Sequence, residues 1–322
     1  MEVIKISPRG YCYGVVDALT IARKAAKDQT LPRPIHIIGQ IIHNRHAIDE
    51  LTTMGVVTLD GPNREEILAQ VKRGTVIFTA HGVSPEVKQR AQEQGLTCID
   101  ATCPDVTKTH DLVKDLVEDG YYILYVGKKG HPEPEGVMGE IPGHVSLIET
   151  EEDVDALQLT PEQEEKIAVS TQTTLSQWDT RRVIQYIKEH YPQASVHVDI
   201  CAATQTRQEA VAEQAKGADL TIVVGDPRSN NTNRLVQVSE ELAGVPAVRI
   251  EDLSQLDQSL LIGKKRIAVT AGASTPSQLT REVIRFLEQY PDGTTGTTAS
   301  TNNNEDAPGT HGIHITFSGS QS

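Results

Sequence analysis

Three cysteines at wide and nearly equal intervals place the strongest constraint on how this chain folds. Cys12, Cys103 and Cys201 are separated by 91 and 98 residues, and two polar loops follow each of them at offsets of 28–31 and 69–73 residues. In chain order, these loops centre on His43 and His81, on His131 and Thr173, and on Ser229 and Ser274. Such self-similarity predicts three similar units that each bring one thiol and two polar loops to a common point.

Short β-branched segments alternate with amphipathic segments along most of the chain, which predicts an α/β fold with mostly parallel sheets. The expected strands are 3–7, 35–38, 56–59, 75–79, 96–99, 121–126, 145–148, 166–170, 195–199, 220–224, 247–250 and 266–270. Helices are expected at 13–27, 105–118, 175–190, 203–216 and 276–289. All nine positions of the repeat follow a predicted strand, where ligands bind in open α/β sheets.

The repeat also divides the chain into domains of ordinary size. We expect α/β units at 13–102, 103–200 and 201–290, with the N-terminal strand in 1–12 joining the third unit. The segment 291–322 is rich in Thr, Asn, Ser and Gly, so we expect a flexible, low-complexity tail with at most one stray strand at 312–317.

Composition excludes several classes of function. The chain has 322 residues, with 44 acidic against 30 basic side chains, and this acidic balance argues against non-specific nucleic-acid binding. It still allows small anionic substrates, which helix N-termini and neutral side chains can hold. The longest strongly apolar run, 121–126, is far below the roughly 18 residues of a membrane span. The N-terminal sequence MEVIKISPRG lacks an apolar signal region, so we expect a cytoplasmic protein without membrane contact.

The sequence contexts of Cys12, Cys103 and Cys201 favour metal ligation. Each residue ends a predicted strand and begins a helix, where the helix dipole stabilises a thiolate. A single free cysteine is more often an inert apolar residue, and this is our interpretation of Cys98 within the strand 96–99. Three matched cysteines without a close Cys-x-x-Cys pair fit an open metal site better than a closed structural zinc site. An iron–sulfur cluster on three thiolates would leave one iron free for a substrate oxygen.

Three of the eleven histidines lie in strand-end loops. We expect His43, His81 and His131 to act as neutral donors or cations beside an anionic ligand rather than as metal ligands. The remaining histidines are interpreted as structural or surface residues: His36, His46, His110, His144, His190, His197, His311 and His314. Glu133 lies two residues after His131, between two prolines, and is a candidate general acid, although a loop glutamate is more often a solvated surface group.

Three hydroxyl- and amide-rich loops complete the pattern at 171–176, 229–234 and 270–276. Each is also explained by ordinary helix N-capping. Together they would form a neutral cradle for a diphosphate, with many O–H and N–H donors and little Lys or Arg. No P-loop or dinucleotide fingerprint is present.

Nine motifs in one order carry a resemblance to a known family. They are PRGYCYGV, HNRH, TAHGVS, DATCPDVTKTH, GHPEPEG, TQTTLS, ICAATQTRQEA, SNNTNRL and VTAGASTP. From about residue 4 to 287 the chain resembles the 4-hydroxy-3-methylbut-2-enyl diphosphate reductases, the IspH/LytB family. This resemblance implies the last step of the methylerythritol phosphate route, in which two electrons and two protons remove an allylic hydroxyl to give isopentenyl and dimethylallyl diphosphates. It also implies three α/β units in pseudo-threefold arrangement around a central iron–sulfur cluster.

The resemblance further implies roles for individual residues. Cys12, Cys103 and Cys201 would hold a [4Fe-4S] cluster whose fourth iron takes the substrate oxygen, and Glu133 would be the proton source. Two residues would pass or position that proton as well as contact the substrate, namely His131 and Thr173. Five would bind the diphosphate, namely His43, His81, Ser229, Asn231 and Ser274. Some relatives have serine at the position of Asn230, whose amide would still contact the ligand. The electron donor would be a ferredoxin or flavodoxin.

Two other classes of protein remain open from the residues alone. A zinc hydrolase with three protein ligands would be colourless and independent of reductant. A non-catalytic iron–sulfur sensor would be brown without turning over the diphosphate, and it would need an effector surface such as a basic helix, which the sequence does not show.

Overall fold

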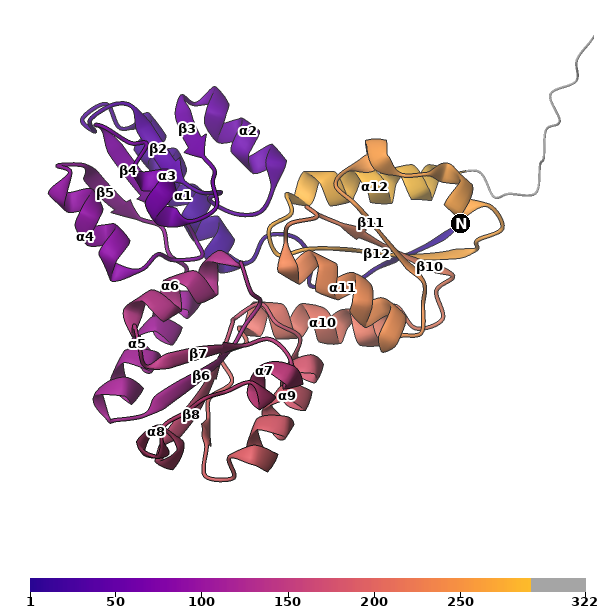
Figure 1. The fold of residues 1–322 in the computed structure, drawn as a ribbon. Coiled ribbons are helices and arrows are strands. Elements are labelled where there is room, and N and C mark those ends of the chain that lie inside the picture. Colours follow the sequence, from indigo (N-terminus) through magenta and orange to yellow (C-terminus); the bar gives the residue numbers. More distant parts are fainter. Residues whose placement is uncertain (291–322) are drawn as a thin grey trace, which may run out of the picture.

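The computed structural model describes residues 1–290, and it folds them into three α/β units. The tail 291–322 and the strand predicted at 312–317 lie outside the described residues. Each unit is built on one four-stranded parallel sheet, and the three units surround a common centre (Figure 1). The predicted fold class, α/β with three similar parallel-sheet units, is confirmed.

The first sheet has the strand order β3-β2-β4-β5. Its strands are β2 (Ile35–Ile38), β3 (Val56–Leu59), β4 (Thr75–Phe78) and β5 (Thr97–Asp100), and its helices are α1 (Tyr13–Lys27), α2 (Arg45–Thr53), α3 (Arg64–Leu68) and α4 (Pro85–Glu93). Successive side chains of β4 alternate between two cores, because a strand has a side-chain period of two. Ile77 packs in the core with α1 and α2, whereas Val76 and Phe78 pack in the core with α3 and α4. The sheet is therefore covered on both faces.

The second sheet repeats this order as β7-β6-β8-β9. Its strands are β6 (Tyr122–Val126), β7 (Val145–Ile148), β8 (Ile167–Thr171) and β9 (Ser195–Val196), and its helices are α5 (Pro104–Glu118), α6 (Pro132–Glu140), α7 (Glu151–Asp155), α8 (Pro161–Glu165) and α9 (Gln177–His190). On β6, Leu124 packs with residues of α7 and α9, and Tyr125 packs with residues of α5 and α6.

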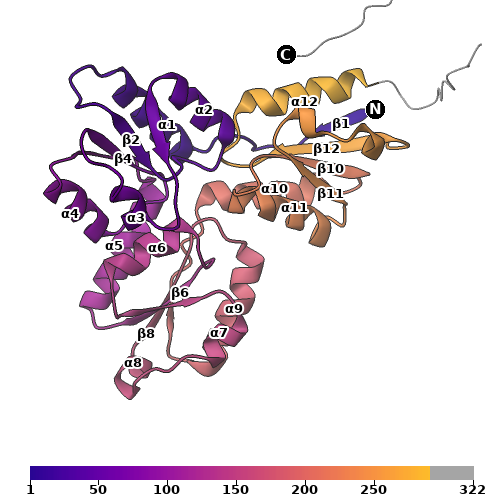
Figure 2. The same cartoon turned by 45° about the horizontal axis from the view of Figure 1, so that its top comes forward.

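The third sheet has the order β11-β10-β12-β1, so its last strand comes from the start of the chain. Its elements are β1 (Glu2–Lys5), α10 (Ala202–Gln214), β10 (Leu220–Val224), α11 (Asn230–Glu241), β11 (Ala247–Ile250), the 3₁₀ helices η1 (Leu253–Gln255) and η2 (Gln258–Leu261), β12 (Arg266–Ala271) and α12 (Ser277–Gln289). Val3 pairs with Ile267 in parallel register, and Figure 2 shows β1 beside β12. The chain thus begins and ends its described part in one unit.

This shared strand order explains the spacing of the polar positions. Each cysteine follows an edge strand, β1, β5 or β9, and directly precedes the first helix of the next stretch, α1, α5 or α10. The other six positions follow the two inner strands of each sheet: β2 and β4, β6 and β8, β10 and β12. All nine positions therefore lie at carboxyl ends of parallel strands, as predicted.

Most predicted elements differ from the observed ones by one or two residues. The exception is the strand predicted at 195–199, which was wrong beyond Val196. There the Asp199 amide donates to the Thr171 hydroxyl instead of a backbone carbonyl, and the Asp199 carboxylate accepts from Ser170. A side-chain acceptor thus interrupts the ladder at Asp199, whereas the N–H groups of His197 and Cys201 still donate to backbone carbonyls of the neighbouring stretch. Similarly, α9 begins at Gln177 because the Ser176 side chain caps it.

Among residues 1–290, no helix has both the length and the apolar character needed to cross a bilayer.

Candidate active site

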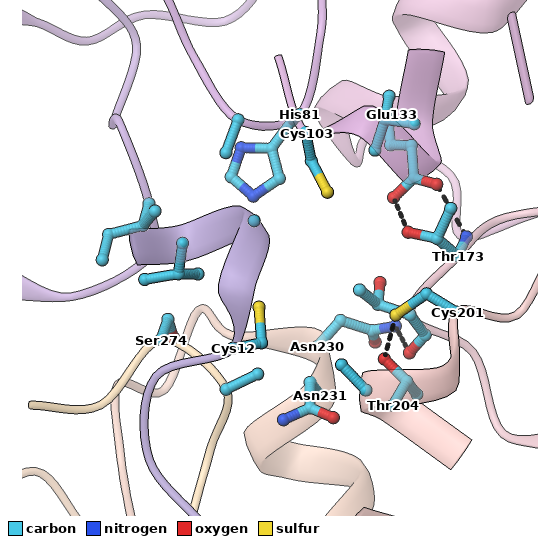
Figure 3. Close-up of a pocket in the computed structure, with 18 of the residues that line it drawn as sticks. Cys12, His81, Cys103, Glu133, Thr173, Cys201, Thr204, Asn230, Asn231 and Ser274 are labelled. Atoms are coloured by element: carbon cyan, nitrogen blue, oxygen red, sulfur yellow. Dashed lines mark hydrogen bonds between the residues drawn. The ribbon is translucent and has the colours of Figure 1, made fainter. Parts of the chain in front are cut away.

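All twelve predicted site residues line a single pocket at the centre of the three units. Its interior offers about 90 Å³ of space for water-sized groups. Its predicted members are Cys12, His43, His81, Cys103, His131, Glu133, Thr173, Cys201, Ser229, Asn230, Asn231 and Ser274. Figure 3 shows the sulfur atoms of the three cysteines pointing into the same central space. The structure thus brings together residues that lie up to 262 positions apart, from Cys12 to Ser274.

The three cysteines occupy equivalent local positions. Cys12, Cys103 and Cys201 are the N-cap residues of α1, α5 and α10, with extended backbones and no side-chain cap bond. Their sulfur atoms therefore lie close to the free N–H groups of helix first turns. Burial raises the pKa of the Cys103 thiol to about 11, and nearby backbone N–H groups oppose that shift. Burial also raises the pKa of Cys201, and a hydrogen bond of 3.2 Å between its sulfur and Thr204 Oγ1 opposes that shift.

The surroundings of the thiols fit a group that binds three sulfurs at once. Gly14, in the first turn of α1, lies against Cys103, and a Cβ atom added there would collide with Cys103 Sγ. The missing side chain lets thiols from two units approach one another. Ala203 and Val106, from the first turns of α10 and α5, line the same wall. Such a cradle of sulfur ligands and small apolar side chains is typical of a thiolate-held metal or cluster. The two carboxyl groups that line the same pocket, of Asp105 and Glu133, already accept hydrogen bonds from Tyr13 and Thr173.

Three histidine rings face one another across the pocket. His43 and His81 stack with ring centroids 4.5 Å apart, and His131 meets them edge-on at 5.7 and 5.4 Å. One nitrogen from each ring lies within 4.8 Å of the others, close enough to contact one small ion or one oxygen-rich group. His43 and His81 come from the first unit and His131 from the second. The three histidine rings therefore meet at the contact between these two units.

The protonation of these rings is set by burial and by hydrogen bonds. Burial lowers the pKa of His43 to about 4 and that of His131 to about 3, and it holds the pKa of His81 well below its usual value. All three rings are therefore neutral at pH 7 in the free protein. His131 Nδ1 accepts from the Glu133 N–H at 3.2 Å, which leaves the ring proton on Nε2. His43 Nδ1 donates to Gln40 Oε1 at 3.2 Å, which leaves Nε2 as the free nitrogen.

Glu133 is a carboxyl group held out of water. Its side chain is only 1% exposed, and Pro132 at the first position of α6 fixes the backbone that turns it inward. Thr173 donates to both carboxylate oxygens, from its backbone N–H at 2.6 Å and from its hydroxyl at 3.1 Å (Figure 3). Burial raises the pKa of Glu133 to about 7, and the two Thr173 bonds oppose that shift. The surface interpretation of this glutamate is therefore excluded, and the carboxyl group is suited to give up a proton near neutral pH.

The third unit supplies a neutral wall. Ser229 caps α11 by accepting from the Thr232 N–H at 3.2 Å, so its structural role and its place in the pocket coexist. Ser274 Oγ donates to the His43 carbonyl at 2.9 Å and joins the third unit to the first. Asn231 is buried, and neither its Oδ1 nor its Nδ2 has a hydrogen-bond partner. Because buried amides rarely stay unpaired, this side chain indicates a polar ligand in the pocket.

Asn230 joins the third unit to the second. Its Nδ2 donates to the Thr174 carbonyl at 3.0 Å. The residue also borders a second cleft, between α9 and α11, in addition to the central pocket. One N–H of its side-chain amide is thus used between units, and the second N–H remains available for a ligand.

Arg64 is a charged residue near the histidines that the sequence did not reveal. It begins α3, is only 7% exposed, and packs against Gly39. Its charge helps to lower the pKa of His43, His81 and His131, after the larger effect of burial. Its backbone N–H donates to Glu135 on α6 at 2.9 Å. No local sequence signal marks it, since an arginine after an N-cap asparagine is expected to be exposed.

Two residues interpreted as structural occupy informative positions. His110 is buried and its Nδ1 lies 2.8 Å from Glu140 Oε1, while its ring fills the space between Gly82 and Gly136. It therefore sets the packing of α6 against the loop that carries His81, consistent with a structural role. Cys98 is half-buried at the margin of a core and does not line the pocket, as predicted.

Fold and site together define a class of protein. Three thiols on three helix N-termini face neutral histidines, hydroxyls and a buried carboxyl group, an arrangement that fits an α/β enzyme with a thiolate-held metal or cluster and a small polar ligand. The chain belongs to the LytB family: the family model described as "LytB protein" matches residues 3–288. Curated relatives support this membership. The chain is 63% identical to the 4-hydroxy-3-methylbut-2-enyl diphosphate reductase of Anoxybacillus flavithermus and 62% identical to that of Bacillus subtilis, in both cases over 90% of this chain and 91% of the relative.

Solved structures agree with this assignment. The E-1-hydroxy-2-methyl-but-2-enyl-4-diphosphate reductase from Plasmodium falciparum is 32% identical, with a TM-score of 0.83 over 94% of this chain and 95% of that chain. A second structure, of (E)-4-hydroxy-3-methyl-but-2-enyl diphosphate reductase, described as the terminal enzyme of the non-mevalonate pathway, is also 32% identical. Its TM-score is 0.63 over 90% of this chain and all of that chain. The family to which the chain belongs is known to bind an iron–sulfur cluster.

Proposed function

We propose that this chain is a 4-hydroxy-3-methylbut-2-enyl diphosphate reductase, the last enzyme of the non-mevalonate route to isoprenoids. It removes the C4 hydroxyl of the allylic diphosphate with two electrons and two protons, giving water and isopentenyl or dimethylallyl diphosphate. The observation that carries the proposal is the central pocket. It joins three convergent thiols, a buried carboxyl group of raised pKa and a set of unpaired polar atoms in one pocket.

Cys12, Cys103 and Cys201 would hold a [4Fe-4S] cluster. The fit rests on three equivalent N-cap positions and on the close approach that Gly14 allows. When bound, such a cluster supplies electrons and one iron whose coordination is not completed by protein. The protein residues have to bind the diphosphate, orient the hydroxyl, exclude water and deliver protons.

The diphosphate would bind between the histidines and the third unit. Asn231 offers an unpaired amide, and the N-terminus of α11 adds free backbone N–H groups beside it. Ser229 and Ser274 contribute hydroxyls from the same wall. Neutral His131 presents Nε2–H, and His43 and His81 gain the ability to donate at both nitrogens once an anion beside them raises their pKa. We favour this anion site over a metal ion on the histidines, because hydroxyl and amide donors share the same space.

Glu133 would protonate the departing hydroxyl. A carboxyl group with a pKa of about 7 is about half protonated at neutral pH, which suits a general acid. Thr173 holds both oxygens of Glu133, so the proton is delivered from a fixed position. His131, which accepts from the Glu133 N–H, is the adjoining group for orienting the substrate or passing the proton.

We further propose that a ferredoxin or flavodoxin supplies the electrons and that the protein works in the cytoplasm. Support comes from the chemistry of the site, because free thiols that bind an exposed cluster need a reducing compartment.

The test is anaerobic purification followed by iron and sulfide analysis, visible spectroscopy and turnover of the allylic diphosphate with reduced donor. The proposal expects a brown protein that carries iron and inorganic sulfide and forms both five-carbon diphosphates. A colourless protein with zinc, indifferent to reductant, would identify a zinc enzyme instead. A brown protein that binds the cluster yet never converts the diphosphate would identify a sensor.

A further inference from the structure

A buried arginine lies between two of the cysteine-bearing segments. Arg207, on α10, is six residues after Cys201 and is 5% exposed. Its guanidinium donates to two backbone carbonyls, that of Ala203 at 2.8 Å and that of Gly10 at 2.7 Å. Ala203 is two residues after Cys201, and Gly10 is two residues before Cys12. Arg207 therefore ties α10, which begins directly after Cys201, to the segment that leads from β1 into Cys12.

The positive charge of Arg207 has no carboxylate partner among the described residues. Both of its hydrogen-bond acceptors are neutral carbonyls, and its Nε is buried without a partner. Burial lowers its pKa, and the only opposing charges are those of Cys12 and Cys201. A guanidinium buried without an anion costs several kcal/mol, so a group of negative charge is expected beside it. The thiols are the one candidate.

Two other buried arginines show the contrast. Arg234, on α11, pairs with Asp179 at 2.8 Å and with Glu241 at 3.2 Å. Arg64 has Glu135 and Asp60 as the carboxylates that act on its charge. Of the three buried arginines in residues 1–290, Arg207 alone has cysteine sulfurs, once they are ionised, as the negative charges that act on it.

We propose that Arg207 is the counter-cation of the cysteine thiolates and of the cluster that they hold. This inference rests on the proposed function, since it assumes that the three cysteines bind the cluster. A cluster on three thiolates carries net negative charge, and reduction adds more. A fixed positive charge beside it favours the reduced form and opposes release of the thiolates. Arg207 is thus a positioning residue that sets the reduction potential without touching substrate.

The proposal is tested by an anaerobic redox titration of the loaded wild type, Arg207→Gln, Arg207→Lys and the matched control Arg234→Gln. Arg207→Gln is expected to shift the midpoint potential to more negative values and to shorten the half-life of the cluster against a chelator several-fold. Arg207→Lys keeps the charge and is expected to retain the wild-type potential, even though one ammonium cannot bridge both carbonyls as the planar fork does. Arg234→Gln removes an arginine that has its own carboxylates, and its potential is expected to stay unchanged.

A wild-type potential in Arg207→Gln would overturn the proposal, and so would an equal shift in Arg234→Gln. If Arg207→Gln does not fold, Arg207→Lys decides alone, because a clear negative shift with the charge retained would contradict an electrostatic role. A readout without turnover is the gain in thermal stability on cluster loading, which should be smaller in Arg207→Gln than in the wild type. Absence of iron from the wild type would contradict the proposed function itself. Failure of the proposed function is thereby distinguished from failure of the Arg207 proposal.

Discussion

The two ends of the central pocket both rest on the threefold repeat, but the side chains at one end are identical and those at the other end differ. At one end, three residues of one type occupy one kind of position, the N-cap of a helix that follows an edge strand. At the other end, the equivalent inner-strand loops carry histidines in the first unit, a histidine and a threonine beside a glutamate in the second, and hydroxyls and amides in the third. The same backbone geometry thus serves a symmetric task and an asymmetric one.

The difference teaches which properties come from the scaffold and which come from individual side chains. A group held by three sulfurs needs equivalent ligands from three directions, and the threefold fold provides them. An asymmetric diphosphate and a single proton transfer need different side chains in each loop. The asymmetric end has two walls. The histidine wall, formed by His43, His81 and His131, is titratable, whereas the neutral wall is formed by Ser229, Asn231 and Ser274. The following experiments test these contrasts.

The largest effect is expected at the symmetric end. Replacement of any one of Cys12, Cys103 or Cys201 by serine removes a sulfur ligand, and we expect each variant to lose the cluster and at least about 10³-fold in turnover. Cys98→Ser is the matched control, because this half-buried cysteine lies outside the pocket, and it should keep full iron content. Iron and sulfide analysis measures the loss in each variant. Unequal losses would contradict the claim that the three cysteines are equivalent ligands.

The next effect concerns Thr173 and the proton. Thr173→Val removes the hydroxyl bond to Glu133 Oε2, which stabilises the ionised carboxylate. The pKa of Glu133 should therefore rise, by roughly one unit, so the descending limb of the pH–rate profile should move to higher pH. We expect about tenfold slower turnover as the carboxyl group loses its orientation. Thr173→Ser keeps the hydroxyl and should retain the wild-type profile; an unshifted limb in Thr173→Val would argue that another group sets it.

Asn231 tests the neutral wall. Asn231→Ala deletes two unpaired polar atoms, and the loss of a hydrogen bond to a charged diphosphate, about 1.5–3 kcal/mol, should raise KM about 10- to 100-fold with a small change in kcat. Asn233→Ala, on the same helix but bonded to the Pro227 carbonyl, is the control and should bind normally. Steady-state kinetics at saturating donor give both constants. A fall in kcat at unchanged KM would assign Asn231 to the chemical step instead.

The smallest effect separates the histidine wall from the neutral one. Burial holds the pKa of free His43 at about 4 and that of His81 well below its usual value, and a bound diphosphate raises both. Binding therefore takes up protons, so affinity for inorganic pyrophosphate should rise as pH falls, by about tenfold between pH 8 and pH 6. Calorimetry in two buffers of different ionisation heat measures this uptake. His43→Gln should reduce this uptake, because the amide cannot take up the proton, and Asn231→Ala should leave it intact. Equal pH dependence in all three proteins would contradict the distinction between the titratable and the neutral wall.

The sequence predicts the architecture well because its signals are local and repeated. The strand ends and the offsets from each cysteine identify all nine loop positions, and two flanking prolines mark Glu133. Features that depend on packing between units escape such reasoning. The burial of Arg64 and Arg207 follows from neighbours far along the chain, and neither has a distinctive local context. The strand predicted at 195–199 failed for a related reason, because side-chain bonds from Asp199 and Thr171 end the ladder early.

The central claim is that cluster binding and proton delivery are separate tasks of the two ends of the pocket. The most direct test is single turnover of dithionite-reduced Glu133→Gln beside wild type, with iron content, paramagnetic resonance spectra and substrate binding measured on the same preparations. The amide keeps the shape of the carboxyl group but cannot donate its proton, so we predict matched iron content and binding with about 10²- to 10⁴-fold slower product formation. Product formation at the wild-type rate would contradict the assignment of Glu133, and loss of the cluster would contradict the separation of the two ends.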